Sequence, residues 1–81
     1  MKTRSELIGE IIDAQNLKII SCEVDLTLYE RRNLIVKNDK EAEFYTKKIQ
    51  ELKTIKERAE ETLVVLMGLL ETEAKKSANI Q

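Results

Sequence analysis

The chain of 81 residues has no histidine, no proline and no tryptophan, and it has one cysteine and two glycines. The lack of histidine removes the side chain that most often acts as a general base or a metal ligand near neutral pH. Glycine and proline, the strongest turn formers, are nearly absent, which argues against a fold of many short strands. A single cysteine, Cys22, cannot form a disulfide within the chain. The Leu, Ile, Lys and Glu that remain abundant favour long helices.

Neither charge nor hydropathy marks the chain for a nucleic acid or a membrane. Its 14 basic and 15 acidic residues give a formal net charge of −1, whereas nucleic-acid-binding domains usually carry a basic excess. The longest apolar run, residues 63–70, is far shorter than the roughly 20 residues that span a bilayer. Since no signal peptide is evident at the N-terminus and cysteine is scarce, we expect a cytoplasmic protein that makes no membrane contact.

A first helix is expected over about residues 3–36. Thr3 and Glu6 match a capping box, in which the hydroxyl accepts a backbone N–H and the carboxylate reaches back to the cap. Beyond this start, residues at alternating steps of four and three form one stripe, as on the buried side of a helix. The stripe consists of Ile8, Ile12, Gln15, Ile19, Cys22, Leu26 and Tyr29.

A turn is expected near residues 37–39, followed by a second helix over about 40–76. Asn38 and Glu41 repeat the capping-box spacing. The second helix has its own stripe, in which Lys56 is the one charged member and can extend its ammonium group to water. This stripe consists of Tyr45, Ile49, Leu52, Lys56, Ala59, Leu63, Leu66 and Leu70. Lys75 and Lys76 suit the negative end of the helix, and residues 77–81 are expected to fray.

A short turn between two long helices predicts an all-α antiparallel hairpin with coiled-coil packing. Residues that face each other should then have a nearly constant sum of residue numbers, which pairs Tyr29 with Tyr45 and Ile8 with Leu66. The same sum places Gly9 near Gly68, where two small residues could let the helix backbones approach closely.

One hairpin buries little apolar surface, because its two helices share a single seam. Even complete domains of this size seldom gain more than about 3–5 kcal/mol from a core. The first helix carries a second apolar stripe, about 100–180° around the helix from Ile19, and a helix with two apolar sides is buried on two sides. The open end of the hairpin is also apolar. We therefore expect a homodimer or larger oligomer, the simplest being two hairpins in a four-helix bundle. The expected interface residues are Leu17, Ile20, Val24, Leu28 and Ile35 on the second stripe, with Leu7, Ile11, Val64, Val65, Met67 and Leu69 at the open end.

No residues predict a catalytic centre, a metal site or a cofactor. Cys22 has no histidine to activate it and is expected to be a small core residue. Glu57, Glu60 and Glu61 resemble part of a carboxylate metal site, but bundles of that kind add histidine ligands that this chain lacks. We interpret the three glutamates as a solvated face.

The sequence predicts a small non-enzymatic protein–protein interaction module, such as an adaptor, regulator or assembly factor. One alternative is a dimer that binds RNA or DNA through the basic residues around the turn, although acidic neighbours dilute their charge. Those residues are Arg31, Arg32, Lys37, Lys40, Lys47 and Lys48. A second alternative is a chaperone or inhibitor that binds a partner protein's helix at the apolar open end. The identity of any partner is not encoded in a recognisable motif.

Overall fold

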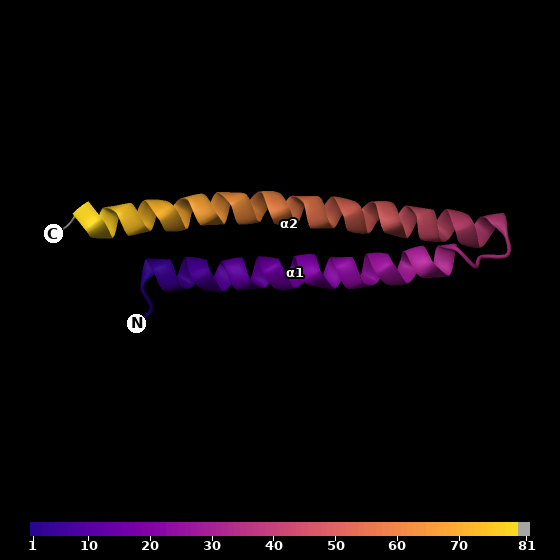
Figure 1. Ribbon diagram of the computed structural model, residues 1–81, viewed down its shortest axis with the longest axis horizontal. Coiled ribbons are helices and arrows are strands. Elements are labelled where there is room, and N and C mark those ends of the chain that lie inside the picture. Colours follow the sequence, from indigo (N-terminus) through magenta and orange to yellow (C-terminus); the bar gives the residue numbers. More distant parts are fainter. Residues whose placement is uncertain (80–81) are drawn as a thin grey trace.

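The computed structural model describes residues 1–79, and in this range the chain consists of two α-helices and no strand. Helix α1 covers Arg4–Asn33 and helix α2 covers Asp39–Asn79. The two helices run antiparallel, side by side, with the N-terminus and the end of α2 at the same end of the molecule (Figure 1). The expected all-α hairpin is thereby confirmed for the described residues.

Side chains cap the start of each helix at the predicted positions. The Thr3 hydroxyl accepts a hydrogen bond from the backbone N–H of Glu6 at 3.1 Å, and the Asn38 Oδ1 accepts one from Glu41 at 2.9 Å. Both bonds satisfy backbone donors that the first turn of a helix leaves without partners. The predicted helix starts therefore follow from local chemistry.

The helix ends differ from those expected. Helix α1 ends at Asn33 rather than near residue 36, so residues 34–38 connect the helices. The backbone shows how the helix ends: the Leu34 N–H still bonds to the Glu30 carbonyl oxygen at 3.2 Å, whereas the Ile35 N–H bonds to that of Arg32 at 3.2 Å, a tighter turn of the kind that often closes a helix. Helix α2 continues to Asn79 instead of ending near Lys76, because no glycine or proline follows Lys76 to stop it. Of the tail expected to fray, residues 80 and 81 lie outside the described residues.

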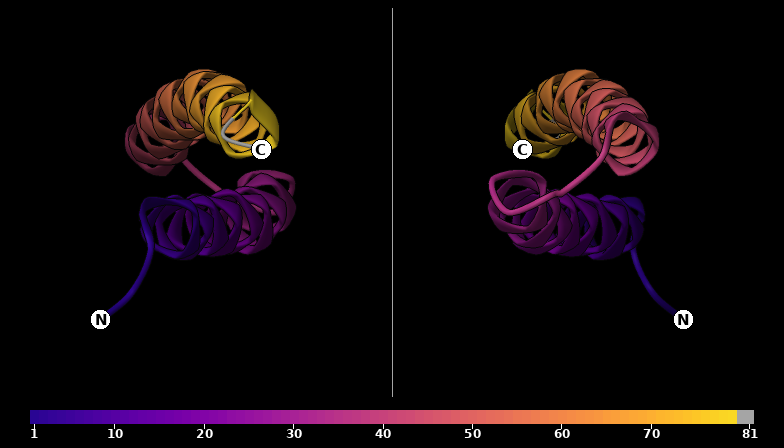
Figure 2. Two further views of the ribbon diagram at one scale, coloured as in Figure 1. Left: turned by 90° about the vertical axis from the view of Figure 1, so that its left-hand side faces the viewer. Right: turned by 90° about the vertical axis from the view of Figure 1, so that its right-hand side faces the viewer.

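The buried side chains lie along the line where the helices meet. They come from the two predicted stripes and have relative exposures between 3% and 9%. The group consists of Ile8, Cys22 and Leu26 from α1 and Ala59 and Leu66 from α2. A view along the hairpin shows that the helices wind around each other (Figure 2), as an apolar repeat of seven residues requires on helices of 3.6 residues per turn.

The molecule is long and thin, measuring 66 × 19 × 15 Å. One seam between two helices is its whole packed interior, and no side chain among the described residues is less than 2% exposed. The fold thus places most of both helix surfaces in solvent. The candidate functional residues therefore lie on these surfaces.

Candidate interaction surfaces

The outward face of α1, defined here by Leu17, Ile20, Val24 and Leu28, is the first candidate surface. Their relative exposures are 68%, 57%, 62% and 43%. These residues lie on the side of α1 opposite the seam, since a step of two residues turns about 200° around a helix and separates Val24 from buried Cys22. Helix α2 covers only the seam side of α1. The four large apolar side chains on the outward face, spaced along the helix, are therefore exposed to solvent.

Ile35, the fifth residue of the predicted second stripe, does not continue this face. It lies beyond the end of α1, in the connection, and is 76% exposed. Its neighbour Leu34, at 85% exposed, was not among the expected interface residues, because on a helix continued to residue 36 it falls outside the second stripe. With Leu28, Arg31 and Arg32, these two residues line a shallow hollow at the tip.

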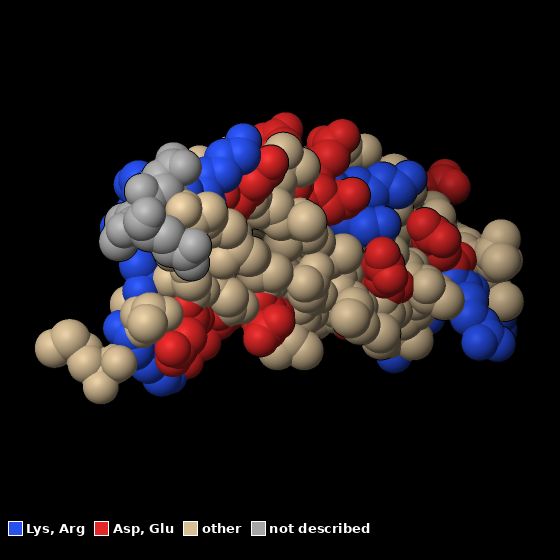
Figure 3. Space-filling view, turned by 60° about the vertical axis from the view of Figure 1, so that its left-hand side comes forward, with Lys and Arg blue, Asp and Glu red and all other residues tan. Residues whose placement is uncertain are grey.

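The open end of the hairpin is the second candidate surface. Its six predicted residues are all exposed on the isolated chain; they are Leu7, Ile11, Val64, Val65, Met67 and Leu69. A hollow spans both helices there, lined by Ile12, Val64, Met67, Gly68, Leu70, Glu71 and Ala74. Figure 3 brings this end forward and shows uncharged residues covering a continuous area, with charged side chains along its margins.

An ion pair joins the two helices beside this open end. Arg4 Nε lies 2.8 Å from Glu73 Oε1, and Lys76 Nζ lies 3.6 Å from the same oxygen. The Glu73 side chain is only 17% exposed, so its carboxylate is held between the helices by two cations. This contact links the first turn of α1 to α2.

The two glycines do not bring the backbones together. A Cβ atom built on Gly9 or on Gly68 has no other atom within 4 Å, apart from its own helix surroundings. The close approach suggested by the sequence is therefore wrong, because the larger side chains along the seam set the distance between the helices.

The basic residues around the turn form no uniform positive surface. Arg31, Arg32, Lys37, Lys40 and Lys47 are exposed and Lys48 is half-buried. Lys48 pairs with Glu51 at 3.6 Å and its ammonium lies 5.9 Å from the centre of the Phe44 ring, while the Arg32 guanidinium lies 5.9 Å from the Tyr29 ring. Two of these six cations, Arg32 and Lys48, thus already have neighbours in the chain. Phe44 itself, 52% exposed, was missed because it lies beside the predicted stripe.

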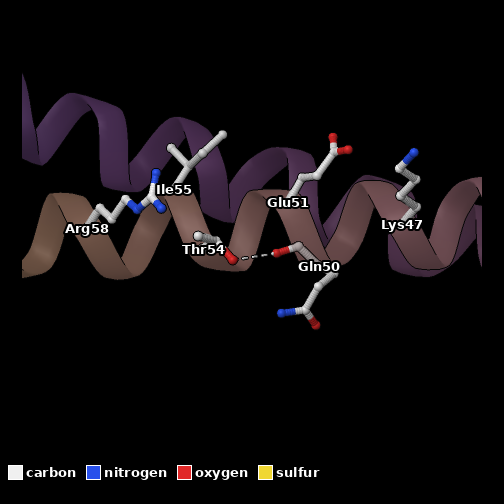
Figure 4. Close-up of a pocket in the computed structure, with 6 residues that line it drawn as sticks. All are labelled: Lys47, Gln50, Glu51, Thr54, Ile55 and Arg58. Atoms are coloured by element: carbon white, nitrogen blue, oxygen red, sulfur yellow. Dashed lines mark hydrogen bonds between the residues drawn. The ribbon is translucent and has the colours of Figure 1, made fainter.

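A groove along α2, shown in Figure 4, was also not predicted. It is lined by Lys47, Gln50, Glu51, Thr54, Ile55 and Arg58. All six side chains belong to one helix, and the Thr54 hydroxyl donates to the Gln50 carbonyl oxygen of that same helix at 3.1 Å. Because no side chain from α1 lines it, polar groups do not converge there on a bound molecule as they do in ligand sites.

Groups that could carry chemistry are scattered over the described part of the chain. Residues 1–79 contain no group of three His, Cys, Asp or Glu placed to hold a metal ion, and Glu57, Glu60 and Glu61 are exposed. Cys22 is a buried free thiol. No helix in the described residues is long and apolar enough to cross a membrane.

Comparison with models of protein families, with curated proteins and with solved structures finds no match to this chain.

Proposed function

We propose that this chain is a small non-enzymatic protein–protein interaction module that acts as a homo-oligomeric helical bundle. One observation carries the proposal: all eleven side chains that the sequence marks as interface residues are between 41% and 76% exposed on the hairpin. Large apolar side chains grouped on two faces are typical of surfaces that bind another protein. Further copies of the chain, or a partner protein, would bury them.

The shape of the molecule supports the same proposal. A compact monomer of 9.4 kDa would expose about 5,000 Å², but this chain exposes 6625 Å². Its radius of gyration is 18.5 Å, compared with about 12 Å for a compact domain of this length. The excess surface is large enough to supply one side of a standard interface, which takes about 800 Å² from each partner. A dimer of hairpins would bring the ratio of core to surface closer to that of a stable domain.

The proposed activity is binding and requires no chemistry from the chain. The role is that of an adaptor, regulator or assembly factor, and its proposed location is the cytoplasm, whose reducing conditions suit the free thiol of Cys22. The apolar open end would serve either more copies of the chain or a helix of a partner protein.

The oligomeric state in solution tests the proposal. Light scattering coupled to size exclusion should give a mass of two or more chains, decreasing toward one chain as the protein is diluted. The midpoint of thermal unfolding should rise with protein concentration, because association stabilises only the folded chain. A monomer at every concentration, with an unfolding midpoint independent of concentration, would contradict self-association.

A further inference from the structure

The outward face of α1 is sorted by charge along its length. Glu10 and Asp13 precede the four apolar residues, and Arg31 follows them, at the same steps of three and four that keep residues on one side of a helix. The face therefore has an acidic N-terminal end, an apolar centre and a basic C-terminal end. A second α1 helix presents the same three zones.

These zones distinguish between the two ways of pairing α1 with a copy of itself. A parallel pair would place Asp13 against Asp13 and Arg31 against Arg31, and like charges in contact repel. An antiparallel pair reverses one helix, so that the acidic end of each copy meets the basic end of the other. The charges thus favour the antiparallel direction.

We propose that a second copy of the chain docks on this face with the two α1 helices antiparallel. The pairing rests on the proposed self-association. It adds that the partner is a second copy of the chain and that the two α1 helices run in opposite directions. When facing residues sum to about 44 or 45, Leu17 lies against Leu28 and Ile20 against Val24, so the four apolar residues cover one another completely. The same register brings Asp13 opposite Arg31 at both ends of the contact.

The two charged residues are available for this contact. Within the described residues neither Asp13 nor Arg31 takes part in an ion pair, and both are exposed. Glu10, by contrast, already pairs with Lys2. In the proposed register Glu10 lies at the rim, beside residues 34 and 35 of the second copy, where its carboxylate keeps contact with water.

The position of this face determines the arrangement of the four helices. In a square bundle each helix contacts two neighbours in directions about 90° apart. Here the seam with α2 and the outward face of α1 lie on opposite sides of α1, about 180° apart. Docking therefore puts the two α1 helices in the middle and the two α2 helices on the outside, in one elongated layer. The apolar open ends stay uncovered in this dimer.

Distances between spin labels test the direction of pairing. Each label is attached to a single cysteine in a chain in which Cys22→Ala removes the native thiol, and circular dichroism verifies that the helices are retained. In the antiparallel register, two Glu6→Cys labels lie about 48 Å apart along the helix, whereas two Ser21→Cys labels lie close together. A dimer with short distances at both positions would overturn the inference and leave self-association intact. A protein that stays monomeric would overturn both.

Charge reversal gives a second test that needs no label. Asp13→Arg and Arg31→Asp should each weaken the dimer about tenfold, because each change reverses the charge in two exposed ion pairs at once. The chain that carries both changes should recover most of its affinity. Glu61→Arg is the matched control for Asp13→Arg, because it makes the same charge change at an exposed position on α2. Equal affinities for the control and the two single variants, or no recovery in the double variant, would refute the Asp13–Arg31 contact.

Discussion

The rings of Tyr29 and Tyr45 pack against each other with their centroids 5.9 Å apart and their planes tilted by 45°. Tyr29 lies in the last turns of α1 and Tyr45 in the first turns of α2, so the pair joins the helices close to the connection. The contact confirms the register predicted from the sum of residue numbers at this end of the hairpin. The pair is also well suited to measuring the interaction energy between the two helices.

A double-mutant cycle on this pair should show that the two tyrosines are coupled. Tyr29→Leu and Tyr45→Leu together should cost less than the sum of the single changes by about 0.5–1.5 kcal/mol, the contribution of an aromatic pair beyond its buried area. The measurement is urea unfolding at one protein concentration, followed by circular dichroism. Tyr29→Leu combined with the distant Leu66→Ala is the control and should be additive. Additivity in the tyrosine cycle itself would show that the rings do not interact.

The cap of α2 is expected to contribute measurably to stability. Asn38→Ala removes the acceptor for the Glu41 N–H and should lower the free energy of unfolding by about 1 kcal/mol, whereas Asn38→Asp keeps an acceptor and should cost little. Chemical denaturation of the three proteins provides the comparison. If the alanine and aspartate variants were equally stable, the hydrogen bond would have no role in starting α2.

Replacing either glycine with alanine should stabilise the protein. Gly9 and Gly68 both lie inside helices with open space where a Cβ would be. Each change to alanine should therefore raise the free energy of unfolding by about 1 kcal/mol, the usual cost of glycine within a helix. Thermal unfolding of Gly9→Ala and Gly68→Ala gives the result directly. A loss of stability at either position would mean that another backbone packs closely against that glycine.

Lys56 occupies a position of the seam stripe that is otherwise apolar. Its ammonium lies 3.3 Å from Glu23 Oε1, and the two side chains are 31% and 53% exposed, so the pair contributes at most about 1 kcal/mol. Lys56→Leu should bury additional apolar surface and raise the free energy of unfolding by about 1 kcal/mol. Lys53→Leu, at an exposed position nearby, should change it by less than about 0.5 kcal/mol. Destabilisation by Lys56→Leu would show that the ion pair matters more than the packing.

The Cys22 thiol should be protected from thiol reagents until the hairpin opens. Cys22 is 6% exposed in the seam, so its reaction depends on local or global unfolding. A coloured disulfide reagent should react slowly with the native protein and rapidly in urea. The chain with Ser77→Cys and Cys22→Ala presents an exposed thiol on α2 and should react rapidly in both conditions. Fast labelling of native Cys22 would place this part of the seam in an open state.

Much of the hairpin could be predicted from the sequence because it depends on short-range chemistry. The caps at Thr3 and Asn38 need only residues three positions apart, and the buried residues follow steps of three and four along each helix. Since both helices start at a cap and lie on either side of one turn, the pairing of Tyr29 with Tyr45 followed as well. Such features are determined by interactions among residues that are close together in the sequence.

The tertiary structure determined the features that depend on how the two helices pack together. The end of α1 at Asn33 is where the chain turns back to pack α2 against α1, which local propensity does not contain, and it left Leu34 and Ile35 in the connection rather than on a helix face. The distance between the backbones at Gly9 and Gly68 was likewise set by the seam as a whole. Sequence determined that α1 has two apolar sides; the packed hairpin showed that α2 covers one of them and leaves Leu17, Ile20, Val24 and Leu28 in solvent, because two helices share only one seam.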